Sequence, residues 1–143
     1  MSALQPYLPG ATVLDLFAGS GALGIEALSR GAAQVTAVEW SRTALRTLRA
    51  NLEALGVGDE LEIIRTDAVD FIRELEEGAY DLALADPPYR TGIVDEIVEI
   101  FLDRRFADSL WVEHGPDEPL PEIPGARTRR YGDTALTSIP APR

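Results

Sequence analysis

The stretch LDLFAGSGALGIEAL, residues 14–28, decides the fold of this chain. An apolar run leads directly into Gly19, Gly21 and Gly24, spaced G-x-G-x-x-G, and a helical pattern follows. Glycines at this spacing allow a sharp strand-to-helix turn whose backbone can approach a ligand, and the helix N-terminus offers unpaired N–H groups. The same spacing also occurs in tight turns that bind nothing, so its meaning depends on the rest of the chain.

Predicted strands and helices alternate on both sides of this turn. Apolar runs predict strands at residues 12–17, 34–39, 61–66, 80–86 and 109–114. Helical spacing predicts helices at residues 21–30, 42–55, 68–75 and 92–102. The segment 126–139, ARTRRYGDTALTSI, predicts a hairpin that turns at Gly132 and Asp133. The expected fold is α/β and Rossmann-like: a mostly parallel seven-stranded sheet with a C-terminal antiparallel hairpin and helices on both faces.

The helix predicted at residues 42–55 has the clearest boundaries. Ser41 is placed to cap its first turn, and Gly56 is placed to end it. Leucines recur at helical spacing at positions 45, 48, 52 and 55.

Composition limits the class of protein. The 143 residues suit one domain, and 45% of them are apolar, as in a globular chain. The chain has no cysteine and one histidine, His114, which excludes a cysteine nucleophile and metal sites built from thiolates or several histidines. No apolar run is long enough to span a bilayer, and the first residues lack a secretory pattern. We expect one cytoplasmic domain over residues 1–143, with no metal and no membrane association.

The charge of the chain is strongly negative. It has 24 acidic and 13 basic residues, all of the latter arginine, for a net charge of −11. This balance repels phosphate backbones at low salt and counts against nucleic-acid binding by the chain alone. An acidic, lysine-free composition also suggests adaptation to high internal salt, where screening shortens the range of charge effects.

Two carboxylates follow predicted strands near the glycine turn. Glu39 ends the second strand, 18 residues after Gly21, where this fold places an acceptor for ribose hydroxyls. Asp67 follows the third strand, where it can either accept from an adenine amino group or cap the helix that begins at Ala68. Trp40 can either flank an adenine ring or be a half-buried surface aromatic. On these residues, NAD and S-adenosylmethionine fit equally well.

The sequence DPPY, residues 86–89, directly follows the fourth predicted strand. The consecutive Pro87 and Pro88 fix an extended backbone and remove two N–H donors. The Asp86 carboxylate and the Pro87 carbonyl then offer two acceptors, and Tyr89 offers a flat face for stacking. This set suits a planar base with an exocyclic NH₂, because two acceptors can hold its hydrogens and aim its lone pair at an electrophilic methyl group. An NAD-linked oxidoreductase would leave this motif without a role, so the motif favours S-adenosylmethionine.

Four segments together resemble one protein family. VLDLFAGSGALGIEALSRGA at residues 13–32, VE at 38–39, DPPY at 86–89 and RRYGDTAL at 129–136 are similar to the RsmD family of bacterial 16S rRNA guanine-N2 methyltransferases. The resemblance covers essentially the whole chain. It implies the class I methyltransferase fold, S-adenosylmethionine as methyl donor, and 16S rRNA or a small-subunit assembly intermediate as partner.

The resemblance also implies roles for individual residues. It assigns the methionine side of the cofactor to Asp15, Ala18, Gly19 and Gly21, the ribose to Glu39, and the adenine to Asp67 and Ala68. It assigns the target amine to Asp86, Pro87, Pro88 and Tyr89.

Members of that family carry a basic N-terminal arm ahead of the first strand, whereas this sequence opens almost directly at that strand. The expectation is therefore a monomeric methyltransferase domain without the arm. Two alternatives stay open: an adenine-N6 methyltransferase on DNA or RNA, because DPPY suits that amine too, and a catalytically impaired core that lacks the arm.

Overall fold

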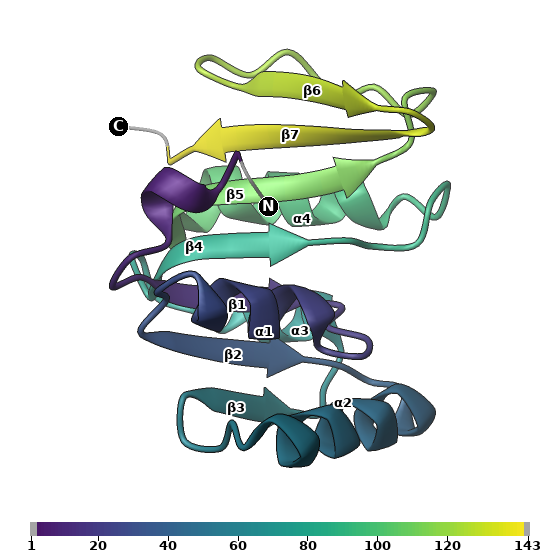
Figure 1. Ribbon diagram of the computed structural model, residues 1–143. Coiled ribbons are helices and arrows are strands. Elements are labelled where there is room, and N and C mark those ends of the chain that lie inside the picture. Colours follow the sequence, from purple (N-terminus) through teal and green to yellow (C-terminus); the bar gives the residue numbers. More distant parts are fainter. Residues whose placement is uncertain (1–2, 142–143) are drawn as a thin grey trace. The chain divides into compact units, whose positions relative to one another are not determined.

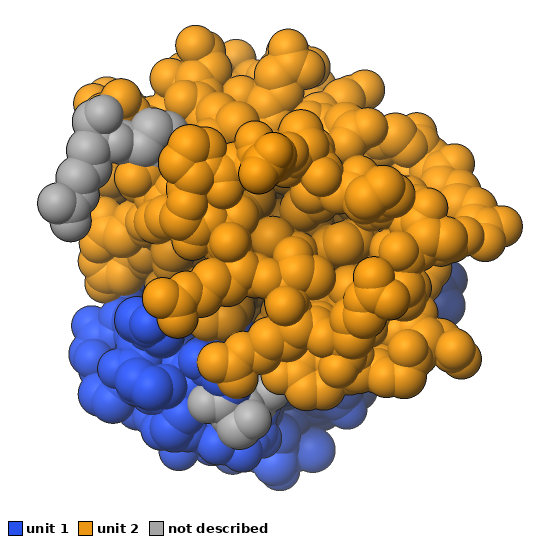
Figure 2. All heavy atoms as spheres, turned by 90° about the horizontal axis from the view of Figure 1, so that it is seen from above, with its two compact units in different colours: residues 1–68 blue, residues 69–143 orange. Residues whose placement is uncertain are grey.

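The structure is a computed structural model that describes residues 3–141 (Figure 1). The chain falls into two compact units, residues 1–68 and residues 69–143, which Figure 2 colours separately. Its seven strands belong to one mixed, mostly parallel sheet with helices packed against it, so the predicted fold class is confirmed. Within residues 3–141, no helix has the length and apolar character needed to cross a membrane.

Unit 1 consists of three parallel strands connected by helices. The strands β1 (Thr12–Leu16), β2 (Gln34–Val38) and β3 (Leu61–Ile64) lie in the order β3-β2-β1. The helices α1 (Ala22–Ser29) and α2 (Arg42–Leu55) connect them, and the short 3-10 helix η1 (Gln5–Tyr7) precedes β1. β1 and β2 are mostly buried, as strands of parallel sheets generally are.

Unit 2 carries the antiparallel part of the sheet. After α3 (Ala68–Arg73), which starts at the last residue of unit 1, come β4 (Tyr80–Ala85), α4 (Ile93–Arg104) and β5 (Ala107–His114). The hairpin of β6 (Arg127–Tyr131) and β7 (Thr134–Pro140) completes the unit, in the order β4-β5-β7-β6. β4 and β5 are parallel, whereas β7 is antiparallel to both β5 and β6. β7, the later strand of the hairpin, therefore lies between β5 and β6.

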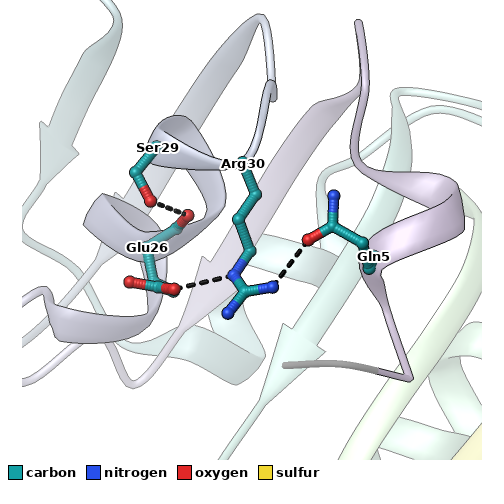
Figure 3. A network of polar contacts seen from close by, with 4 residues as sticks. All are labelled: Gln5, Glu26, Ser29 and Arg30. Carbon is teal, nitrogen blue, oxygen red and sulfur yellow. Dashed lines mark hydrogen bonds and ion pairs between the residues drawn. The ribbon is translucent and has the colours of Figure 1, made fainter.

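A polar network fixes the segment that precedes β1 to the end of α1 (Figure 3). Arg30 Nε lies 2.7 Å from Glu26 Oε1, and Arg30 Nη1 donates to Gln5 Oε1 over 2.7 Å. The Ser29 hydroxyl donates to the backbone carbonyl of Glu26. These contacts connect η1 with the last turn of α1, the helix that follows the glycine turn.

The predicted elements are confirmed, with shifts at their ends. Ser41 Oγ accepts from the Ala44 N–H and caps α2, and Gly56 ends that helix with a φ of +66°. β1 stops one residue early because Phe17 has a φ of +62°, which takes it out of the extended region. Leu55 is 61% exposed, because it is the last helical residue, beyond the buried face of α2.

Candidate active site

The turn between β1 and α1 has the sharp backbone that its glycines predict. Gly19 and Gly21 have φ angles of +58° and +83°, and the Gly21 N–H donates to the Ala18 carbonyl over 2.9 Å. A methyl group on Gly21 would lie 2.1 Å from Leu48 Cδ1, so any side chain there would collide with α2. A methyl group on Gly19 would meet no described atom within 4 Å, so the loop has open space at that residue.

Gly24 lets α1 pack closely on the sheet. A methyl group there would lie 3.0 Å from Val35 Cγ1 on β2 and 3.3 Å from Asp15 Oδ2 on β1. Asp15 itself is 2% exposed, so the closeness of helix and strand also encloses this carboxylate. The absence of a side chain at Gly24 therefore permits this close approach of α1 to the sheet.

Glu39 connects the end of β2 to the glycine turn. Its Oε1 accepts from the Gly19 N–H over 2.9 Å, and its Oε2 accepts from the Ser41 N–H over 2.8 Å. Asn51 on α2 supports the same turn, because its Nδ2 donates to the Ser20 carbonyl over 2.9 Å. A carboxylate can accept about four hydrogen bonds, so the two from the backbone fix Glu39 and leave further acceptor capacity.

The other predicted cofactor residues of unit 1 lie at the ends of β2 and β3. Trp40 is 62% exposed, which makes it more open than the half-buried aromatic considered from the sequence. The Arg65 guanidinium lies 4.7 Å from the centre of its ring, and Arg65 Nε donates to the Trp40 carbonyl. Asp67 is exposed and immediately precedes α3, whose first residue, Ala68, is buried.

The DPPY motif begins at the end of β4 in unit 2. Asp86 is the first residue after that strand, Pro87 is buried, and Pro88 is exposed. The Thr91 hydroxyl donates to the Pro88 carbonyl over 3.0 Å and closes the turn that follows. The Tyr89 ring is 44% exposed, and its hydroxyl lies 2.5 Å from Thr134 Oγ1 at the start of β7. The Tyr89 side chain is therefore anchored at its hydroxyl end and partly exposed.

Asp86 lies beside a second carboxylate, Glu113. The parallel register pairs Ala85 with Val112, which brings Asp86, just after β4, alongside Glu113 of β5. Burial, the negative charge of Glu113 and a side-chain hydrogen bond with Glu113 together raise the pKa of Asp86 to about 6. Asp86 therefore takes up a proton much closer to neutral pH than an ordinary aspartate does.

The turn after DPPY is tied to the loop after β5. The Arg90 N–H donates to Glu118 Oε1 over 2.8 Å, and the Arg90 guanidinium pairs with Asp117. His114, at the end of β5, binds the backbone of this loop. Its Nδ1 lies 3.0 Å from the carbonyl oxygens of Gly115 and Glu118. Both of those partners are acceptors, so Nδ1 carries a proton, and Nε2 lies 2.7 Å from the Thr137 hydroxyl oxygen.

The predicted site residues thus form two groups, one in each unit. In unit 1 the glycine turn, Asp15 and Glu39 lie together. In unit 2 Asp86 and Tyr89 share a set of hydrogen bonds with Glu113 and Thr134, which sequence reasoning missed. An acidic residue near the carboxyl end of a predicted strand was the signal that identified Glu39 and Asp86, and the same signal was present in WVEH for Glu113.

Comparison with known proteins gives a consistent picture. Residues 1–139 match the family described as "Conserved hypothetical protein 95". The "Ribosomal RNA small subunit methyltransferase D" of Escherichia coli (strain K12) is 36% identical over 124 residues, which cover 85% of this chain and 62% of that protein. The "Putative rRNA methyltransferase YlbH" of Bacillus subtilis (strain 168) is 31% identical over 142 residues, which cover 93% of this chain and 77% of that protein. The chain therefore spans less than two thirds of the length of the Escherichia coli relative.

A solved structure agrees with these sequence matches. The "Putative methyltransferase yhhF from Escherichia coli" is similar at a TM-score of 0.81 and 33% identity, covering 96% of this chain and 78% of that one. The Rossmann-like architecture described above is therefore a methyltransferase fold.

Proposed function

This chain belongs to the conserved hypothetical protein 95 family, the RsmD family that its motifs resemble, and from this premise we propose that it methylates the exocyclic N2 amine of a guanine in 16S rRNA. S-adenosylmethionine is the proposed methyl donor. The observation that carries the proposal is the Asp86–Tyr89 turn, in which a carboxylate that binds a proton near neutral pH stands three residues from an anchored, accessible aromatic ring.

The residues of this turn can position the target base. Asp86 and the Pro87 carbonyl accept the two amine hydrogens and so aim the nitrogen lone pair outward. Tyr89 stacks on the base, a contact worth about 1–3 kcal/mol, after the guanine has been flipped out of its own stack. The consecutive prolines keep this arrangement rigid, and Asp86 takes the proton that the amine loses when it is methylated.

The residues of unit 1 fit the methyl donor. S-adenosylmethionine, when bound, supplies an electrophilic methyl group. Glu39 has acceptor capacity beyond its two backbone bonds and would hold the ribose hydroxyls, and the open space at Gly19 admits a ligand close to the backbone. Asp15, Ala18 and Gly21 would line the methionine side, and Asp67, Ala68 and Trp40 the adenine side.

Further properties belong to the same proposal. Residues 1–143 act as one methyltransferase domain and as a monomer, without metal or membrane. The partner is 16S rRNA or a small-subunit assembly intermediate, which sets the activity in the cytoplasm. The names of the relatives and the family membership support this assignment.

Two experiments test the proposal in sequence. Calorimetric titration with S-adenosylhomocysteine, with NAD as comparison ligand, should give binding of the former alone; binding of NAD alone would contradict the proposal.

Transfer of a radiolabelled methyl group to 16S rRNA and to immature small subunits, followed by nucleoside analysis, should give N2-methylguanosine. Asp86→Ala should abolish transfer while it preserves S-adenosylhomocysteine binding. A product on adenine N6 would favour that alternative, and binding without any transfer would favour an impaired core.

A further inference from the structure

Four side chains of unit 2 form a connected set of contacts around the DPPY turn, which we call the circuit: Asp86, Tyr89, Glu113 and Thr134. Tyr89 Oη lies 2.5 Å from Thr134 Oγ1, and the Thr134 hydroxyl donates to Glu113 Oε1 over 3.1 Å. Glu113 is in turn hydrogen-bonded to the Asp86 carboxyl group, three residues before Tyr89. The two ends of the motif are thus connected to each other through β5 and β7.

The positions of the protons follow from the partners. Thr134 has one hydroxyl proton and gives it to Glu113, so its oxygen must accept from the Tyr89 hydroxyl. Asp86 and Glu113 are two neighbouring carboxylates, so ionisation of both together is unfavourable, and this contributes to the raised pKa of Asp86. Glu113 therefore acts on both the carboxylate and the aromatic ring of the motif.

We propose that Glu113 is a positioning residue for the methyl transfer proposed above: it orients the Asp86 carboxylate beside it and, through Thr134, the Tyr89 ring. This inference rests on the proposed function. In the reaction, the guanine N2 lone pair forms a bond to the methyl carbon, and the carbon–sulfur bond breaks with its electron pair left on sulfur. The methylated nitrogen is then cationic and passes one proton to the Asp86 carboxylate, which releases it to water after the product leaves.

The other charged groups described near the turn in unit 2 do not compete with this role. Arg90 is engaged by Asp117 and Glu118 in the adjoining loops. His114 follows Glu113 but binds the Gly115 and Glu118 carbonyls and Thr137 instead. Burial is the largest cause of the raised pKa of Asp86, followed by the charge of Glu113 and the hydrogen bond with it.

A titration without substrate tests the pair directly. Carboxyl ¹³C NMR of the full chain labelled at aspartate measures the proton affinity of Asp86, and the spectrum of Asp86→Asn assigns its resonance. We expect a midpoint near 6 in the wild type and a fall of more than about one pH unit in Glu113→Gln, because glutamine removes the charge and donates to Asp86 instead. Glu122→Gln removes the same charge from an exposed loop residue outside the circuit and should leave the midpoint in place.

Kinetics on the rRNA substrate test the use of the pair. In Glu113→Gln the acid limb of kcat/KM should move to lower pH with the NMR midpoint, and kcat at pH 8 should fall about tenfold, with KM for S-adenosylmethionine unchanged. Thr134→Val, which breaks the circuit between Tyr89 and Glu113, should raise KM for the RNA. Thr134→Ser keeps the hydroxyl and should therefore keep the KM for the RNA at its wild-type value.

The two readouts separate failure of this inference from failure of the proposed function. An Asp86 midpoint that is the same in wild type and Glu113→Gln overturns the inference, even in an active enzyme. So does an unchanged acid limb in a Glu113→Gln variant that transfers methyl groups. In another outcome, the Asp86 midpoint differs between wild type and Glu113→Gln, but the wild type transfers no methyl group to any rRNA substrate. That outcome overturns the proposed function, and with it the catalytic use of the pair.

Discussion

Two carboxylates at strand ends, Glu39 and Asp86, are held in opposite ways. Glu39 accepts from two backbone N–H groups, one at each of its carboxylate oxygens. Asp86 faces a second carboxylate and keeps a proton at higher pH than usual. At the residue scale, the same chemical group therefore suits the two tasks that the proposed function requires: Glu39 for holding hydroxyl groups and Asp86 for exchanging a proton.

Glu39→Gln should weaken S-adenosylhomocysteine binding about 10- to 100-fold, because hydrogen bonds to a charged group are worth about 1.5–3 kcal/mol. Glutamine offers one oxygen where two backbone N–H groups, of Gly19 and Ser41, now meet acceptors, so one donor would face its NH₂ group. Calorimetric titration measures the change. Glu60→Gln, at an exposed residue just before β3, is the control for lost charge. Equal affinity in Glu39→Gln and wild type would argue against the ribose role.

Asp86→Asn should stabilise the fold at pH 8 and have little effect at pH 4. The pKa of Asp86 is raised in the folded state to about 6, so the folded chain binds this proton more tightly than the unfolded chain does. Stability from this group is therefore present at low pH and is lost as the pH rises through about 6. Solvent screening of the partly exposed side chain limits the difference to about 1 kcal/mol, or about 2–4 °C in Tm.

Thermal melts of both proteins between pH 4 and pH 8 measure this effect. Asp81→Asn, at an exposed residue near the start of the same strand, serves as the comparison variant. If wild type and Asp86→Asn lose stability in parallel as the pH rises, Asp86 is not the group responsible.

At the scale of single elements, the sequence predicted those features that depend on neighbouring residues. The cap at Ser41, the stop at Gly56 and the glycine turn follow from local backbone geometry, so their sequence patterns were sufficient. Glu113 and Thr134 could not be joined to the DPPY turn in this way. Their contact depends on the register of β4 on β5 and on the inner position of β7, which pair residues far apart in the chain.

The packing of α1 on the sheet can be tested at Gly24. Alanine gains about 1 kcal/mol over glycine inside a helix, but its methyl group would lie 3.0 Å from Val35 and 3.3 Å from the Asp15 carboxylate. Overpacking of a close contact costs about 1–3 kcal/mol, so we expect Gly24→Ala to lose about 1 kcal/mol net. Gly58→Ala, where a methyl group meets nothing within 4 Å, should instead be neutral or stabilising by up to about 1 kcal/mol. Urea unfolding of both variants measures the difference, and a more stable Gly24→Ala would mean that α1 moves away at no cost.

At the scale of the whole molecule, the charge and the proposed substrate oppose each other. A net charge of −11 repels an RNA backbone, and this repulsion decreases as salt is added. Any contacts with phosphates weaken over the same range of salt. Base-directed contacts from the DPPY turn depend much less on salt, so recognition through this turn suits such a chain better than recognition through phosphates.

The composition predicts that this protein is more stable in concentrated KCl than in dilute buffer. With 24 acidic and 13 basic residues, folding brings mostly like charges together. Between 0.1 M and 1 M salt the Debye length falls from about 10 Å to about 3 Å, which removes most of the repulsion between exposed groups. We expect a gain of about 2 kcal/mol, or about 4–8 °C in Tm, with most of it complete by about 1 M. Replacing the exposed Asp59 and Glu60 with Asn and Gln should reduce this gain in Tm, because it removes two of the repelling negative charges. A Tm that does not rise with KCl, or that rises equally in the neutralised variant, would show that the acidic surface is not an adaptation to salt.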